Sequence, residues 1–111
     1  MTLENFVNAV GFEVINKGGG LERELSKVFC CDLLSLVMSK NPENSVWVTV
    51  MGNVNTIAVS VLTDGGCIIL AENANLDGNA MTKAAEQEVT VLRTPLPVFE
   101  AALAAHKLIE N

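Results

Sequence analysis

Six polar residues lie where short apolar runs of this sequence pass into helix-forming segments. They are Asp32, Ser35, Thr49, Asn53, Asn55 and Thr94. Parallel strands bring their carboxyl ends, and the amino termini of the helices that follow, to one edge of a sheet. Those helix termini carry free N–H groups and the positive end of the helix dipole, and both attract anions. The spacing therefore predicts a binding edge for a small anionic metabolite or a nucleotide phosphate.

A purely structural interpretation competes with this one. Asp32, Asn53 and Thr94 would serve as helix N-caps with or without a ligand, and capping alone is the favoured interpretation of these three. Ser35 and Asn55 are not needed to start a helix, so they carry more of the binding hypothesis. Asp32 would repel an anion, and we expect it to act as a cap or to accept a ligand hydroxyl.

Catalytic chemistry has little support in the sequence. An enzyme needs a positioned acid, base or nucleophile, and the single histidine, His106, lies between Ala105 and Lys107 in the expected last helix. A solvated or partner-facing role is favoured there. Gly18–Gly20 is not followed by the Gly-Lys-Ser/Thr of a phosphate-binding loop, so we interpret it as a flexible turn. We expect no enzyme activity, no catalytic residue and no cofactor.

The three cysteines are interpreted as reduced. Their number is odd, and Cys30 and Cys31 are adjacent, which disfavours an ordinary disulfide between them. One histidine also leaves no four-ligand zinc spacing, so no metal is expected. A vicinal thiol pair for redox sensing or for binding thiophilic metals is the alternative to a strand end with one cysteine in the core. We favour the strand end, because a free cysteine behaves as a small buried hydrophobe.

Short apolar runs alternate with helix-period segments and predict the elements that position these residues. Strands are expected at 12–15, 24–30, 46–51, 67–71 and 89–92, and helices at 2–10, 32–40, 53–63, 77–88 and from Thr94-Pro95 onward. The first two strands lie close in sequence, and we expect a hairpin. Residues 57–61 also fit an alternating strand, but the stripe at Val54, Ile57, Ala58, Val61 and Leu62 favours a helix.

Self-association is expected from two features. Trp47 is interpreted as a core or interface anchor, and the last helix is expected to turn Phe99, Leu103 and Leu108 toward the sheet. The Trp47 strand and the alanine-rich last helix would then form a self-complementary patch, which predicts a homodimer.

Composition excludes several classes of protein. The chain has 111 residues, of which half are hydrophobic, so residues 1–111 are expected to form one globular domain. The net charge is −6, with seven basic residues scattered among thirteen acidic ones, so neither nucleic acid nor an anionic membrane is an expected partner. No run approaches the about 18 apolar residues of a membrane span, and Met1–Ala9 has no basic segment typical of a signal peptide. A cytoplasmic location is expected.

Several separated motifs resemble one known family. These are Cys31-Asp32-Leu33-Leu34-Ser35, Val46-Trp47-Val48-Thr49, Asn55-Thr56-Ile57-Ala58-Val59 and Ile68-Ile69-Leu70-Ala71-Glu72. In this order, and over nearly the whole chain, they resemble the DRTGG domain, in particular stand-alone proteins similar to the N-terminal domain of HPr kinase/phosphorylase. The resemblance implies a three-layer α/β/α fold with a mostly parallel five-stranded sheet. It also implies a non-catalytic, often dimerising module.

The sequence departs from that family at its name-giving positions. The family has an Asp-Arg-Thr run that opens the central helix and a Gly-Gly after the next strand. Asn53-Val54-Asn55 and Glu72-Asn73 stand there in this chain. Kinase activity is not implied, because the phosphate-binding loop of HPr kinase belongs to a separate catalytic domain. The expected function is a regulatory module that dimerises and binds a small anionic metabolite or nucleotide. The alternative is a pure protein-interaction subunit of a metabolic or redox enzyme system.

Overall fold

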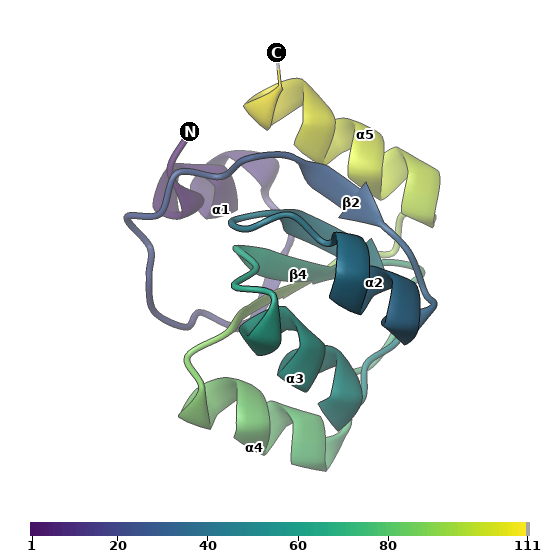
Figure 1. The fold of residues 1–111 in the computed structure, drawn as a ribbon. Coiled ribbons are helices and arrows are strands. Elements are labelled where there is room, and N and C mark those ends of the chain that lie inside the picture. Colours follow the sequence, from purple (N-terminus) through teal and green to yellow (C-terminus); the bar gives the residue numbers. More distant parts are fainter. Residues whose placement is uncertain (111) are drawn as a thin grey trace.

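A computed structural model describes residues 1–110 as an α/β structure with five helices and five strands. The elements in chain order are α1 (Leu3–Val10), β1 (Glu13–Asn16), β2 (Val28–Cys30), α2 (Leu34–Lys40), β3 (Val46–Thr49), α3 (Val54–Leu62), β4 (Cys67–Leu70), α4 (Gly78–Glu86), β5 (Thr90–Arg93) and α5 (Val98–Ile109). Helices α1 and α5 cover one face of the sheet, and α2, α3 and α4 cover the other (Figure 1). The three-layer, mostly parallel fold is therefore confirmed.

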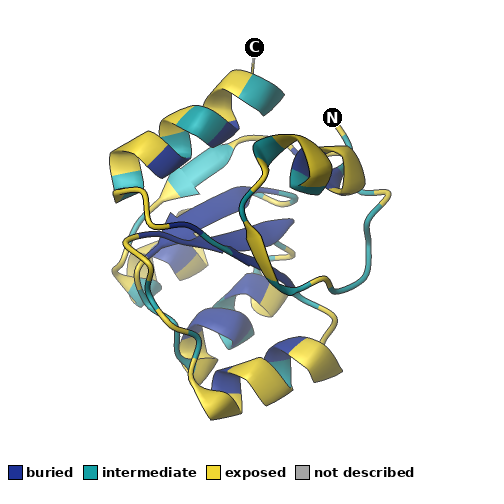
Figure 2. Ribbon diagram, turned by 180° about the vertical axis from the view of Figure 1, so that it is seen from behind, coloured by how far each residue is buried: buried dark blue, intermediate teal, exposed yellow. Residues whose placement is uncertain are grey.

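The sheet has the strand order β1-β5-β4-β3-β2. Strands β2, β3, β4 and β5 are parallel, and only β1 runs antiparallel, beside β5. The central strands β3 and β4 are buried at every residue, whereas the edge strands are partly exposed (Figure 2). The carboxyl ends of four strands consequently share one edge of the sheet.

The predicted hairpin between the first two strands is wrong, because β1 and β2 lie at opposite edges. The glycine run packs against the start of β5 instead. A Cβ on Gly18 would come within 2.6 Å of the Glu88 carbonyl oxygen, and the Thr90 hydroxyl donates to the Lys17 carbonyl. Residues 21–25 then follow α1 across the molecule, with the N–H of Leu3 donating to the Arg23 carbonyl. Tertiary contacts with β5 and α1 therefore replace the local strand pairing.

Two helices, α1 and α3, form where local sequence signals predicted them. Thr2 caps α1 by accepting from the N–H of Asn5, and Gly11 ends it with a left-handed φ of 71°. The ambiguous segment is the helix α3, which buries Thr56, Ile57 and Ser60. These features depend on short-range hydrogen bonds and helical periodicity, and the sequence carries both.

The last helix starts later than predicted and turns other residues toward the sheet. Helix α5 begins at Val98 after Pro97, not at Thr94-Pro95, and it buries Ala101 and Ala105 against the sheet. Phe99 is 68% exposed and Leu103 is 36% exposed, so both point away from the core. Of the three predicted contacts, only Leu108 packs against the core cluster. Small side chains on the sheet side let this helix approach closely.

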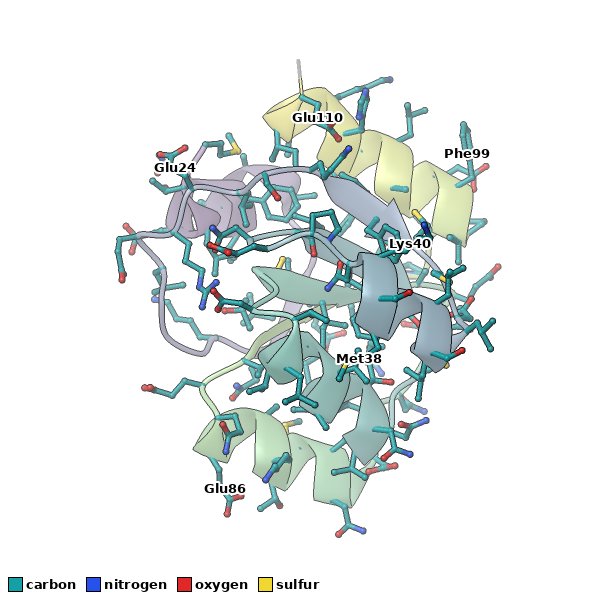
Figure 3. The ribbon with its side chains drawn as sticks, viewed as in Figure 1. Glu24, Met38, Lys40, Glu86, Phe99 and Glu110 are labelled. Atoms are coloured by element: carbon teal, nitrogen blue, oxygen red, sulfur yellow. The ribbon has the colours of Figure 1, made fainter. Side chains whose placement is uncertain are left out.

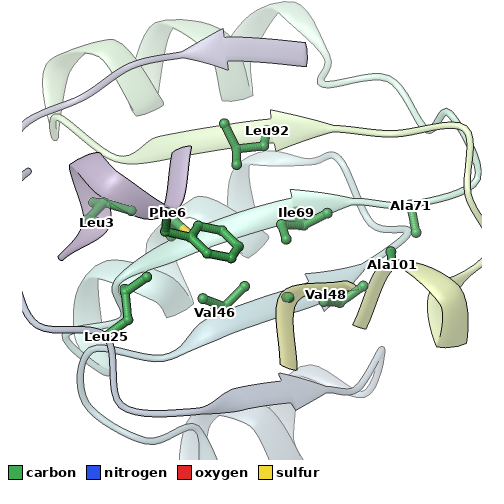
Figure 4. Close-up of a cluster of buried hydrophobic side chains, with 11 residues drawn as sticks. Leu3, Phe6, Leu25, Val46, Val48, Ile69, Ala71, Leu92 and Ala101 are labelled. Atoms are coloured by element: carbon green, nitrogen blue, oxygen red, sulfur yellow. The ribbon is translucent and has the colours of Figure 1, made fainter. Parts of the chain in front are cut away.

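Two hydrophobic clusters fill the two sides of the sheet. Phe6 of α1 and Ala101 of α5 pack on Val46, Val48 and Ile69 (Figure 4). On the other face, Trp47 is fully buried among residues of α2, α3 and α4, and its indole N–H donates to the Cys31 carbonyl at 2.9 Å. Trp47 is thus a core residue and contributes nothing to the surface patch predicted for dimerisation. Within residues 1–110, no helix has the length and apolar character needed to cross a membrane.

Candidate ligand-binding edge

Asp32 joins the carboxyl ends of β2 and β3. Its Oδ1 accepts hydrogen bonds from the Thr49 hydroxyl and from the N–H of Val50, the latter at 3.0 Å. The predicted capping role is wrong, because Leu33 occupies the N-cap position of α2 and makes no side-chain cap bond. Asp32 is exposed and Thr49 is buried. The carboxylate therefore faces solvent while it holds two strand ends together.

Asn53 caps the amino terminus of α3, as predicted. The side-chain oxygen of Asn53 accepts from the N–H groups of Asn55 at 2.9 Å and Thr56 at 3.2 Å. This cap occupies two of the N–H groups that would otherwise be free to bind an anion. Any anion at this terminus must therefore rely on side-chain donors as well as on the backbone.

Ser35 and Asn55 present exposed polar side chains in the first turns of α2 and α3. Neither side chain takes part in a hydrogen bond within residues 1–110; only the backbone N–H of Asn55 is used, by the Asn53 cap. A hydroxyl and a carboxamide are good donors to anionic oxygens and to ligand carbonyls. Of the six predicted residues, these two are the ones whose side chains have no role in the fold described here.

Thr94 does not contribute an exposed group to this edge. It is 3% exposed, and its hydroxyl accepts from the N–H of Leu96. Its backbone N–H donates to the Leu70 carbonyl and its carbonyl accepts from Asn73. The prediction that Thr94 caps the last helix is wrong, because that helix starts four residues later at Val98. Thr94 instead supports the loop that follows β4.

The loops after β3 and β4 contain residues that the site prediction missed. Gly52 lies so close to the next loop that a Cβ would come within 1.9 Å of the Asn75 carbonyl oxygen. Glu72 and Asn73 both have left-handed φ angles, 55° and 57°. These are the positions where the resemblance placed the family's Gly-Gly, and glycine adopts this conformation without steric cost. The sequence signal that could have identified this loop was Glu72-Asn73 in place of the family's Gly-Gly.

Charge at this edge is mixed. Arg93 at the end of β5 donates to the Asn75 side-chain oxygen and forms an ion pair with Glu13 at 3.0 Å. Its guanidinium is therefore already engaged, while Asp32 and Glu72 add negative charge nearby in the strand-end loops. A ligand that offers hydroxyl groups to Asp32 fits this edge better than a bare phosphate does.

Two of the three cysteine thiols have raised pKa values. Burial raises the pKa of the Cys30 thiol, and the Asp32 carboxylate and the Cys31 thiol raise it further. Burial also raises the pKa of Cys67 to about 12. Thiols with raised pKa values are poor nucleophiles because the thiolate is the reactive form. Within residues 1–110, no group of three or more His, Cys, Asp or Glu side chains is placed to hold a metal ion.

Three hollows in the surface lie away from the predicted residues. One is lined by Arg23, Asp64 and Glu88 near the amino ends of the strands, one lies between β2 and α5, and one lies beside Thr2 and Leu21. At the carboxyl edge, Asp32, Ser35 and Asn55 are exposed.

Comparisons with known proteins identify the class of protein that this fold defines. The chain matches the DRTGG domain family over residues 5–108, and it therefore belongs to that family. A comparison with curated proteins finds no match.

A solved structure with the same fold is similar to this chain. It is described as the CBS and DRTGG domains of the regulatory region of Clostridium perfringens pyrophosphatase, complexed with the activator diadenosine tetraphosphate. The TM-score is 0.74 at 15% sequence identity, and the match covers 94% of this chain and 45% of that chain. The likeness establishes a shared fold, and this chain spans less than half the length of its structural neighbour.

Proposed function

We propose that residues 1–111 act as one non-catalytic regulatory domain that dimerises and binds a small anionic metabolite or nucleotide. The observation that carries the ligand proposal is that Ser35 and Asn55, in the first turns of α2 and α3, have exposed side chains that make no hydrogen bond within residues 1–110. Membership of the DRTGG family supports a regulatory role, and the activator complex of a neighbour with this fold directs the search toward nucleotides. The cytoplasmic location stays a prediction.

The ligand would be held at the edge formed by the ends of β2 and β3 and the first turns of α2 and α3. Asn55 and Ser35 would donate hydrogen bonds to anionic or carbonyl oxygens, and Asp32 would accept from a hydroxyl such as those of a ribose. Thr49 and Asn53 would position these groups without touching the ligand, since both side chains are engaged within the fold. Thr94 would support the neighbouring loop.

Two asparagine variants separate binding from stability. Titration calorimetry with AMP, ATP and diadenosine tetraphosphate should show that Asn55→Ala weakens binding by about 1–2 kcal/mol, through loss of one hydrogen bond. Its melting temperature should stay near that of the wild type, because the Asn55 side chain has no partner within residues 1–110. Asn53→Ala should lower the free energy of unfolding by about 1 kcal/mol through loss of the cap.

The alternative is a pure protein-interaction subunit, and one observation favours it. Leu33 is 62% exposed and Leu36 is 39% exposed at the start of α2, beside the proposed ligand edge. Exposed apolar side chains in one region are typical of protein contacts. If none of the three nucleotides raises the melting temperature and both asparagine variants change stability alone, the ligand site is wrong and this alternative replaces it.

A further inference from the structure

A polar cavity lies at the amino ends of β4 and β5, at the opposite end of these strands from the candidate ligand edge. Its volume is about 190 Å³. Its walls come from the glycine turn Gly19-Gly20, from Asp64 after α3 and from Glu88 after α4. At about 30 Å³ for each water, this volume holds about six non-hydrogen atoms. The cavity is therefore of a size for a small metabolite.

Arg23 presents one free edge of its guanidinium in this cavity. Its Nη1 donates to the Asn44 side-chain oxygen at 2.6 Å and to the Asp64 carbonyl at 3.3 Å, and its Nη2 donates to Oδ1 of Asp64 at 2.9 Å. A guanidinium has five N–H groups. The Nε–H and one N–H of Nη2 therefore remain, and neither makes a hydrogen bond within residues 1–110. Two such parallel donors match the two oxygens of a carboxylate.

Gly20 leaves room beside these two donors. Its carbonyl accepts from the N–H of Arg23 at 3.0 Å, which folds the arginine back toward the glycine turn. A Cβ on Gly20 would come within 2.9 Å of Nε of Arg23. Any side chain at this position would crowd the free edge of the guanidinium, so the glycine keeps that edge accessible.

Glu88 places a negative charge on the neighbouring wall. A Cβ on Gly19 would come within 3.3 Å of Oε1 of Glu88, so this carboxylate lies against the glycine turn. It makes no hydrogen bond or ion pair within residues 1–110. Helices α3 and α4 also end at this cavity, and the carboxyl end of a helix carries negative partial charge. This wall therefore favours an ammonium group.

The two charged walls select a ligand that carries both charges. A simple anion would be repelled by the carboxylates of Asp64 and Glu88, and a simple cation would be repelled by Arg23. Gly19 and Gly20, which lie against the carboxylate and the guanidinium, have Cα atoms about 3.8 Å apart. Both charges therefore flank one small space, which fits a compact zwitterion.

We propose that this cavity binds a small aliphatic α-amino acid, such as alanine or valine. The amino-acid carboxylate accepts two hydrogen bonds from Arg23, and its ammonium group donates to Glu88. Val61 and Val89, which also line the cavity, contact the aliphatic side chain. This inference goes beyond the proposed function, which concerns the opposite end of the parallel strands.

Analogues of valine that lack one charge test the chemistry of the site. Titration calorimetry at millimolar ligand should show binding of valine, which should also raise the melting temperature. Isobutylamine lacks the carboxylate and 3-methylbutanoate lacks the ammonium group, and each should bind at least tenfold more weakly. Absence of binding by both alanine and valine, or equal binding by the two analogues, would overturn the proposal.

A matched pair of charge variants tests the assigned wall. Glu88→Gln should weaken valine binding at least tenfold, because it removes the charge that faces the ammonium group. The control is Glu86→Gln: Glu86 projects from the end of α4 away from the body of the molecule (Figure 3) and does not line the cavity. The control should bind valine as the wild type does, and circular dichroism should show that both variants are folded. Equal binding by the two variants would contradict the role of Glu88.

Amide chemical shifts locate the bound amino acid. In ¹⁵N-labelled protein, valine should move the amide signals of Gly19, Gly20 and Gly65, which line the cavity. Asn55→Ala should leave valine binding unchanged, because Asn55 belongs to the opposite end. Valine binding without nucleotide binding would support this cavity and contradict the proposed ligand edge. Nucleotide binding without valine binding would do the reverse.

Discussion

At the level of single residues, the loops after β3 and β4 show how close backbone approach shapes the candidate edge. The carbonyl of Gly52 accepts from the N–H of Asp77. Glu72 and Asn73 turn the backbone by left-handed φ angles, and their N–H groups donate to the carbonyls of Leu96 and Thr94. Asparagine tolerates this conformation better than glutamate does. The loop is therefore held by backbone hydrogen bonds to the segment that follows β5.

Gly52 and Gly78 allow a matched test of this packing. Gly52→Ala should lower the free energy of unfolding by about 3 kcal/mol, because a Cβ would come within 1.9 Å of the Asn75 carbonyl oxygen. At Gly78, the first residue of α4, a Cβ meets nothing within 4 Å. Gly78→Ala should raise the free energy of unfolding by about 0.5 kcal/mol, since alanine restricts the unfolded chain. Urea unfolding curves measure both values, and equal effects would show that the two loops are not in contact.

At the level of elements, α5 and β2 are joined by the Glu110 carboxylate near the end of the described chain. The hydrogen bond from the N–H of Val28 lowers the pKa of Glu110, and the hydrogen bond with His106 lowers it further. The folded state therefore favours the charged carboxylate. Its contribution to stability is present above the pKa of the unfolded chain and is lost as pH falls through the folded pKa.

This coupling predicts how Glu110→Gln changes the pH dependence of stability. The wild type should be more stable than the variant at pH 6, and the difference should shrink as the pH is lowered to 3. The measurement is the urea midpoint of both proteins at several pH values. A difference that stays constant over this range would show that the Val28–Glu110 bond does not depend on the charge of the carboxylate.

At the level of the whole molecule, Cys67 reports on the integrity of the core. It begins the central strand β4, is fully buried, and has a pKa raised by burial to about 12. Thiol reagents require both access and the thiolate form. Its reaction therefore requires an opening of the sheet between the two helix layers.

We predict that Ellman's reagent at pH 8 modifies Cys67 only as fast as the molecule unfolds. In a Cys30→Ser, Cys31→Ser variant, the remaining thiol should react slowly in buffer, and its rate should rise steeply with urea. The rate should follow the population of unfolded molecules measured by tryptophan fluorescence, because Trp47 is fully buried in β3, the strand that pairs with β4. Fast reaction without urea would contradict the tightly packed sheet.

Sequence reasoning went furthest where the signals are local. Thr2, Gly11 and Asn53 mark helix ends through hydrogen bonds and φ angles within a few residues, and the apolar stripe of 54–62 is a property of one helix. The buried strands β3 and β4 are apolar runs, interrupted only by Thr49 at the end of β3, as expected for strands that are covered on both faces. The resemblance to the DRTGG family added the prediction of a three-layer α/β/α fold. These features were predictable because each is encoded within one element.

Tertiary structure alone decided the features that depend on distant segments. Nothing near β1 and β2 in sequence shows that β1 would pair with β5, since that choice follows from Asn16 and Gly18 packing against residues 84–90. The same holds for Asp32, which binds Thr49 rather than capping α2, and for Phe99, which faces outward because Ala101 and Ala105 face the sheet. A cap or an apolar stripe needs only its own residues. A strand partner, a helix face or an open edge is set by competition among all the surfaces of the chain for burial.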